Sequence, residues 1–165
     1  MQRTTLRATG YISILFGLFW IIITTLGFVH LLSNGESSAV QNESIAALCD
    51  MFFEVWYNPA LLIYNFSSAP SGTASIFWCV ATLVVMVIFL ISGIKLIKYS
   101  NEDYDLKENV SKTVMFIIFT GIILAFSIFG CIKALEIGAM MYVNIGVLVV
   151  MFILPIIECI KATKD

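Results

Sequence analysis

Charged residues are scarce in this sequence. Asp, Glu, Lys and Arg make up only 12% of its 165 residues, against about a quarter in soluble domains. Only nine residues are Lys or Arg, and the net charge is -2. A nucleic-acid-binding face needs clustered basic residues, so we expect no nucleic-acid partner.

Groups that could perform catalysis are equally rare. The single histidine, His30, is not part of an HExxH, HxxxH or Cys-His pattern, so no metal-ligand set is visible. No GxSxG or similar nucleophile motif occurs. We therefore expect no enzymatic activity, no metal and no other cofactor.

Apolar residues dominate instead. They make up 60% of the chain, and the mean hydropathy is +0.98; a soluble core of this size could not bury so much apolar surface. Four stretches reach the roughly 20 apolar residues that a helix needs to cross a bilayer. They lie at about 8–32, 75–99, 113–134 and 138–160. The sequence predicts an all-α fold, a four-helix transmembrane bundle forming a single membrane domain surrounded by lipid.

The basic residues predict the orientation of the bundle. Lys and Arg stay cytosolic when they lie in short loops near the ends of spans. All of them except Lys133 lie in the N-terminal tail, between residues 95 and 112, or in the C-terminal tail. Both termini and the loop 100–112 are therefore expected in the cytosol, and the outer loop 33–72 on the other side.

The first span has a second interpretation, as a cleaved signal peptide. Its apolar run from Ala8 to Leu32 exceeds the roughly 7 to 15 residues of a signal-peptide core, which favours a retained anchor. Cleavage would leave three spans, with the later loops on the same sides.

The outer loop contains an unusually apolar stretch, CDMFFEVWYNPALLIYNF at residues 49–66. Apolar residues recur at helical spacing before it and within it, at Ile45, Leu48, Phe52 and Val55. This pattern predicts a short amphipathic helix that lies along the outer surface and ends at Asn58-Pro59. Phe52, Trp56 and Tyr57 are the candidate partner-binding surface on this helix. The alternative is a loop that only packs on the bundle.

Three glycosylation sequons test the orientation. Asn42 and Asn65 lie in the predicted outer loop and are candidate glycosylation sites. Asn109 lies on the predicted cytosolic side and should remain unmodified.

The fourth span has a polar face. Asn144, Met151, Pro155 and Glu158 recur at helical spacing along one line. Asn144 and Glu158 are therefore candidates for a polar path for an ion or substrate. The alternative is a hydrogen bond between helices at Asn144, with Glu158 at the membrane interface beside Lys161.

Small residues predict where helices pack closely. In the third span, Thr113, Thr120 and Ser127 recur every seven residues, and Gly121 with Ala125 forms a small-xxx-small pair. Ser13 and Gly17 form a similar pair in the first span.

The four cysteines differ by position. Cys49, Cys79 and Cys131 are all expected near the outer face, where either free thiols or one disulfide would fit. Cys159 lies beside the cytosolic interface and is a candidate palmitoylation site.

The layout resembles that of the lysosome-associated transmembrane family and of related insect four-span proteins of unknown function. The residues that carry the resemblance are LRATGYISILFG in the first span, ISGIKLIKYSN after the second, the outer loop with its sequons, and a last span that runs directly into a short charged tail. The family's proline-tyrosine tail motifs are absent from KATKD, and its N-terminal cysteines are absent from MQRTTLR. The resemblance implies an endosomal or lysosomal membrane protein with a sorting or transport-accessory role.

Two functions follow from these observations. The first is a non-enzymatic scaffold, trafficking adaptor or accessory subunit that contacts a membrane-protein partner, or a second copy of itself, through the outer loop and helix faces. The second is a small transporter or channel component that uses Asn144 and Glu158. The plasma membrane and the endosomal or lysosomal membrane are the expected locations.

Overall fold

The structure, a computed structural model, describes residues 4–32, 43–63, 72–101, 106–133 and 138–162. These residues are helical throughout, apart from short connections, and contain no strand. Four helices are long and apolar enough to cross a membrane: α1 (Thr4–Leu32), α4 (Gly72–Tyr99), α5 (Leu106–Lys133) and α6 (Ala139–Ala162). The predicted all-α fold with four spans is confirmed.

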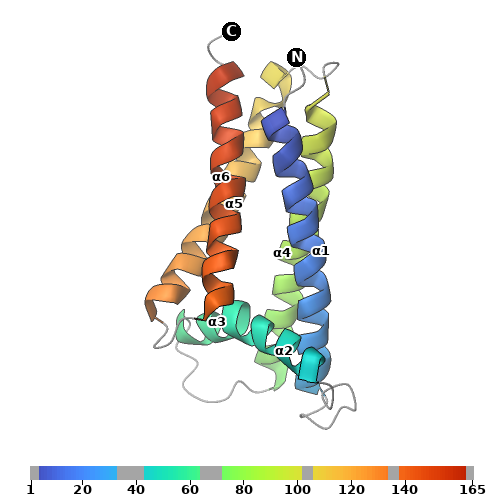
Figure 1. Ribbon diagram of the computed structural model, residues 1–165, viewed down its shortest axis with the longest axis vertical. Helices are drawn as coiled ribbons and strands as arrows, with labels where there is room; N and C mark the ends of the chain where they lie inside the picture. The colour runs from blue at the N-terminus through green and yellow to red at the C-terminus, as the bar shows by residue number, and fades with distance from the viewer. Residues whose placement is uncertain (1–3, 33–42, 64–71, 102–105, 134–137, 163–165) are drawn as a thin grey trace.

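The four long helices run side by side, and both chain termini lie at the same end of the bundle, which we call the terminal end (Figure 1). A shorter helical segment lies across the opposite end, which we call the α2 end. It consists of α2 (Glu43–Phe52), a π-helical turn η2 (Phe53–Tyr57) and α3 (Asn58–Ile63).

Helix α5 begins earlier than the sequence predicts, at Leu106 instead of residue 113. The loop between α4 and α5 is correspondingly shorter than the predicted 100–112. Hydropathy marks the part of a helix that lies in hydrocarbon, whereas backbone hydrogen bonding continues into polar residues such as Lys112.

The most extensive contact in the bundle is between α1 and α4. Gly10 of α1 lies against Gly93 of α4, and Gly17 lies against the backbone of Met86. Between these two contacts, the Ser13 hydroxyl donates a 2.7 Å hydrogen bond to the Phe89 carbonyl oxygen. The small residues predicted to allow close approach in the first span, Ser13 and Gly17, therefore pack on α4.

Helices α5 and α6 form the second pair. The seven-residue repeat of Thr113, Thr120 and Ser127 is buried along its whole length. These residues, which the sequence predicts to lie where helices pack closely, are therefore inside the bundle. Of the predicted small-residue pair, Gly121 contacts the Phe152 ring on α6, whereas Ala125 is exposed.

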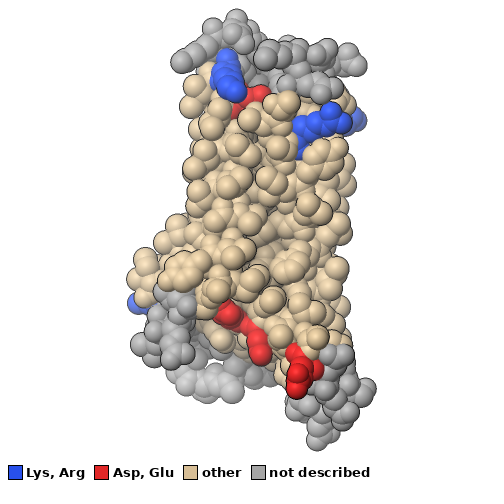
Figure 2. Space-filling model, in the orientation of Figure 1, with Lys and Arg blue, Asp and Glu red and all other residues tan. Residues whose placement is uncertain are grey.

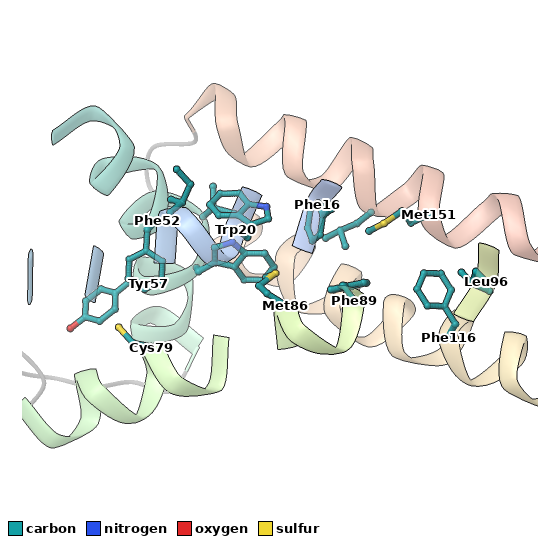
Figure 3. Close-up of a cluster of buried hydrophobic side chains, with 14 of the residues drawn as sticks. Phe16, Trp20, Phe52, Tyr57, Cys79, Met86, Phe89, Leu96, Phe116 and Met151 are labelled. Carbon is teal, nitrogen blue, oxygen red and sulfur yellow. The ribbon is translucent and has the colours of Figure 1, made fainter. Parts of the chain in front are cut away.

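The bundle core is a column of aromatic, Met and Leu side chains along the axis (Figure 3). The Phe89 ring packs edge-on to Phe16 of α1, with centroids 5.3 Å apart. Phe89 also contacts Phe119 of α5, with centroids 4.9 Å apart. These rings connect α1, α4 and α5 at mid-bundle.

The charged residues on this face lie at the two ends of the molecule (Figure 2). Among the described residues, every Lys and Arg except Lys133 lies toward the terminal end. Glu43, Asp50 and Glu54 lie toward the α2 end, and Glu158 lies at the terminal end. This is the asymmetry on which the orientation prediction depends, and the orientation itself remains a prediction.

Candidate functional site

Three aromatic residues of the segment formed by α2 and η2 lie inside the core. Phe52, Trp56 and Tyr57 are 0%, 2% and 7% exposed. Phe52 contacts α1 at Gly27, where the missing side chain leaves room for its ring. The prediction that these three residues form an exposed partner surface is therefore wrong for this structure, because desolvating such large rings stabilises the bundle more than exposing them would.

Trp56 of η2 contacts three of the four membrane-spanning helices. Its ring meets Trp20 of α1 edge-on at 5.6 Å and stacks on Phe126 of α5 at 6.4 Å. Its carbonyl oxygen accepts a 2.9 Å hydrogen bond from Nε1 of Trp78 on α4. The side chains that the sequence predicts to bind a partner therefore fill the core at the α2 end of the bundle.

The outer helical segment does not end at Asn58-Pro59, as predicted, but continues to Ile63. The π-helical turn explains the difference: the Asn58 N–H donates to the Phe53 carbonyl oxygen, one residue further back than in an α-helix. The wider turn accommodates a proline near the start of α3, where its missing N–H is tolerated. Pro59 is buried and contacts α5 at Gly130.

A carboxylate from the outer segment meets the beginning of α6. The Glu54 carboxylate occupies the space that a Cβ on Gly138, the residue before α6, would take. A negative charge at this position is stabilised by the partial positive charge of the helix N-terminus. Glu54 and Gly138 are far apart in sequence, so no local pattern could have paired them.

On α6, Asn144 is buried between helices. Its Nδ2 donates a 3.4 Å hydrogen bond to Oγ of Ser127 on α5. Its Oδ1 is buried and has no hydrogen-bond partner in the described part of the chain. Asn144 therefore makes the predicted hydrogen bond between helices and leaves one acceptor, its Oδ1, without a hydrogen bond.

Asn144 also lines a groove between α1 and α6. The groove has a volume of about 250 Å³, and its other lining residues are apolar, among them Leu15 and Phe19 of α1 and Val147 of α6. Leu15 is 68% exposed at its edge. The groove therefore faces the bilayer laterally, with one amide in an apolar wall.

Glu158 lies near the terminal end of α6 and is only 7% exposed. Its Oε2 is 3.6 Å from Nζ of Lys161, one turn on, and the Lys161 side chain is 64% exposed. The predicted pairing is present, so the buried carboxylate has a cation at the membrane interface.

The structure does not bring Asn144 and Glu158 together. They are separated by about 21 Å of helix, and Leu148 and Met151 between them are both completely buried. The polar face of α6 is therefore two separate polar positions joined by an apolar section.

The cysteines are all free thiols in the structure. Cys49 and Cys79 are buried, and Cys131 and Cys159 are half-buried. Burial, and next the negative charge of Asp50, raise the pKa of the Cys49 thiol above its ordinary value of 9.0. Cys49 is therefore a poor nucleophile at neutral pH.

The three sequons and the single histidine lie in different parts of the chain. Asn42 and Asn65 lie outside the described residues, and Asn109 lies in the first turn of α5. The His30 ring packs edge-on to Phe53 at 5.9 Å. Within the described ranges, no group of three or more His, Cys, Asp or Glu side chains could hold a metal ion.

Four long apolar helices, packed around an apolar core with charge at their ends, define a multi-pass integral membrane protein. Comparisons with protein-family models, with curated proteins and with solved structures find no match. Any more specific function must therefore be argued from the chain's own residues.

Proposed function

We propose that this protein is a non-enzymatic scaffold, trafficking adaptor or accessory subunit that acts by lateral contact with another membrane protein. Because Phe52, Trp56 and Tyr57 are buried, the contact is assigned to a helix face instead of the outer loop. The α1–α6 groove is the face that fits best, since it combines an apolar wall with a buried polar group.

The observation that carries this proposal is the unpaired Oδ1 of Asn144. Hydrocarbon offers no hydrogen-bond donor, so an unsatisfied amide oxygen is costly there. Asn144 belongs to the groove wall, so a rotation of its amide would bring Oδ1 within reach of a Ser, Thr or similar donor on a transmembrane helix of the partner. Polar side chains are common bonds between membrane helices, each contributing about 0.6 kcal/mol on average.

The test is site-specific photocrosslinking in the native membrane. A photoreactive residue at Leu15, on the groove edge and 68% exposed, should form a crosslink to one defined membrane protein. The matched control is the same residue at Ile118 of α5, which is 57% exposed and is not among the groove residues. Asn144→Leu should reduce the Leu15 crosslink about threefold, the change in occupancy that corresponds to about 0.6 kcal/mol, while the protein still folds.

Each outcome of this experiment either supports or contradicts the proposal. Crosslinks that are the same from Leu15 and Ile118, or that are unchanged by Asn144→Leu, would contradict the proposal. A crosslink to a second copy of this chain would show that the partner is another copy of the protein in a homo-oligomer. This result supports lateral contact through the groove.

The second candidate is a small transporter or channel component that uses Asn144 and Glu158. It is favoured by the nearly complete burial of an ionisable side chain, Glu158, in a membrane helix, because such residues often mark ion or proton paths. The buried Leu148 and Met151 between the two polar residues favour the scaffold instead. Glu158→Gln should abolish flux in a transporter and leave partner crosslinking unchanged in a scaffold.

The location of the protein and its glycosylation at Asn42 and Asn65 belong to the same proposal. An endosomal or lysosomal membrane fits the resemblance to the lysosome-associated transmembrane family, and the plasma membrane is the other location that we propose. Proximity labelling from a tag in the outer loop would identify both the compartment and the neighbouring proteins. Exclusive labelling of proteins from another organelle would overturn this location.

A further inference from the structure

A second lateral opening lies between α4 and α5, on the terminal half of the bundle. These two helices contact each other much less than α1 and α4 do. Toward the α2 end the gap between them is closed by aromatic rings, with Trp78 packed 5.6 Å from Phe126. On the terminal half there is a cleft of about 560 Å³.

The cleft is polar at one end and apolar at the other. Lys95 and Tyr99 of α4 and Lys112 of α5 line it near the terminal end. The Lys112 Nζ lies 5.5 Å from the centroid of the Tyr99 ring. Deeper in the bundle the walls are Phe116 and Phe119, and Phe119 is about 10 Å along the helix from Lys112.

The charge of the lining is of one sign. Two lysines are the side chains of the lining that are charged at neutral pH, and no carboxylate is among the described residues that form the walls. Lys95 is exposed, and Met115 at the edge is 71% exposed, so the cleft opens toward the surrounding bilayer.

An apolar cleft that opens into a bilayer is filled by a lipid chain, because no other apolar solvent is present. Lysines near the ends of membrane helices place their ammonium groups at the level of the lipid headgroups. Two ammonium groups above one chain-sized apolar cleft would select a lipid with a net negative headgroup, since basic pockets between membrane helices bind such headgroups.

We propose that the α4–α5 cleft is a binding site for one anionic glycerophospholipid of the leaflet at the terminal end. The ammonium groups of Lys95 and Lys112 hold its phosphate, and one acyl chain packs against Phe116 and Phe119. This site is separate from the α1–α6 groove and does not depend on the proposed partner contact.

The test uses the full-length protein in nanodiscs that contain equal amounts of phosphatidylglycerol and phosphatidylcholine with identical chains. After extraction, native mass spectrometry measures which lipid stays bound. The wild-type protein should retain phosphatidylglycerol preferentially. Lys95→Gln combined with Lys112→Gln should weaken this preference on the order of tenfold, given the attraction of each lysine for anionic lipid.

The matched control is Lys133→Gln combined with Lys161→Gln, which removes the same charge from residues outside the cleft. It should leave the preference unchanged. Ser92→Phe tests the acyl-chain half of the site, because Ser92 lines the cleft and the larger ring would occupy it without changing charge. This variant should lower retention of phosphatidylglycerol, and melting curves in detergent establish that each variant is folded.

Three results would overturn the proposal. The first is equal retention of the two lipids by the wild-type protein, and the second is an equal loss of preference in the control double variant. The third is displacement of the bound lipid by millimolar glycerol phosphate, which would show that the lysines bind a free phosphate group and that the acyl chain contributes nothing.

Discussion

Gly10 of α1 and Gly93 of α4 lie backbone against backbone: a Cβ added to either residue would be 2.7 Å from the carbonyl oxygen of the other. The contact is reciprocal, so both glycines are needed for the helices to approach this closely. In a bilayer, helices gain little from hydrophobic burial and depend on such close packing. The α1–α4 pair is therefore sensitive to added side-chain volume at these two positions.

Gly93→Val should destabilise the bundle by about 1–3 kcal/mol, the usual range for overpacking, because the nearest obstructing atom, the Gly10 carbonyl oxygen, belongs to the backbone and cannot rotate away. The measurement is the melting temperature of the purified protein in detergent. Gly146→Val is the matched control, since a Cβ on Gly146 has nothing within 4 Å. Equal melting temperatures for the two variants would show that α1 and α4 do not pack in this way.

Phe52→Ala should reduce stability by about 3–5 kcal/mol, the range for removing a buried Phe, because its side chain is completely buried. Phe77→Ala removes the same atoms from an α4 residue that is 71% exposed and should have a much smaller effect. Thermal melting in detergent compares the two. An unchanged melting curve for Phe52→Ala would restore the outer surface predicted from the sequence.

Both termini should be in the cytosol, because nearly all the basic residues lie at the terminal end. Epitope tags at the two termini should both be protected from protease in intact cells and both be cleaved after permeabilisation. The sequons provide an independent control: in Asn42→Gln combined with Asn65→Gln, no glycan should remain. A glycan that is then removed by Asn109→Gln would mean that the topology is inverted.

Cys49 should titrate above the ordinary thiol pKa of 9.0, because burial and the charge of Asp50 disfavour its thiolate. In a variant that retains only Cys49, alkylation in detergent should reach half its maximal rate above pH 9.0, whereas the unfolded protein should do so near that value. A half-maximal rate below the ordinary thiol pKa in the folded protein would contradict the buried position of this residue.

The raised pKa of Cys49 also makes the stability of the folded protein decrease as the pH rises. The folded pKa lies above the unfolded one, so the contribution of Cys49 is present below the unfolded pKa and is lost as pH rises through the folded pKa. Wild-type protein should therefore lose more stability than Cys49→Ala when the pH is raised from about 8 to about 10.5. An identical loss in both proteins would show that this thiol is not buried.

The sequence by itself determined the four spans, because the solvent of a membrane helix is decided by the apolar residues along that one segment. It also indicated local pairings on one helix, such as Glu158 with Lys161, and the small-residue faces at Ser13 and Thr120. Each of these depends on spacing within a single helix, which the chain order specifies directly.

Tertiary structure alone decided which faces meet. The sequence around Phe52 and Trp56 is equally compatible with exposed and with buried aromatic side chains. These side chains are buried because Gly27 leaves room for the Phe52 ring and because rings of α1 and α5 pack against Trp56. Likewise, Lys95 and Lys112 lie on different helices, and their shared cleft exists because α4 packs on α1 more closely than on α5. Contacts between distant segments depend on the shapes of both surfaces, which no local pattern specifies.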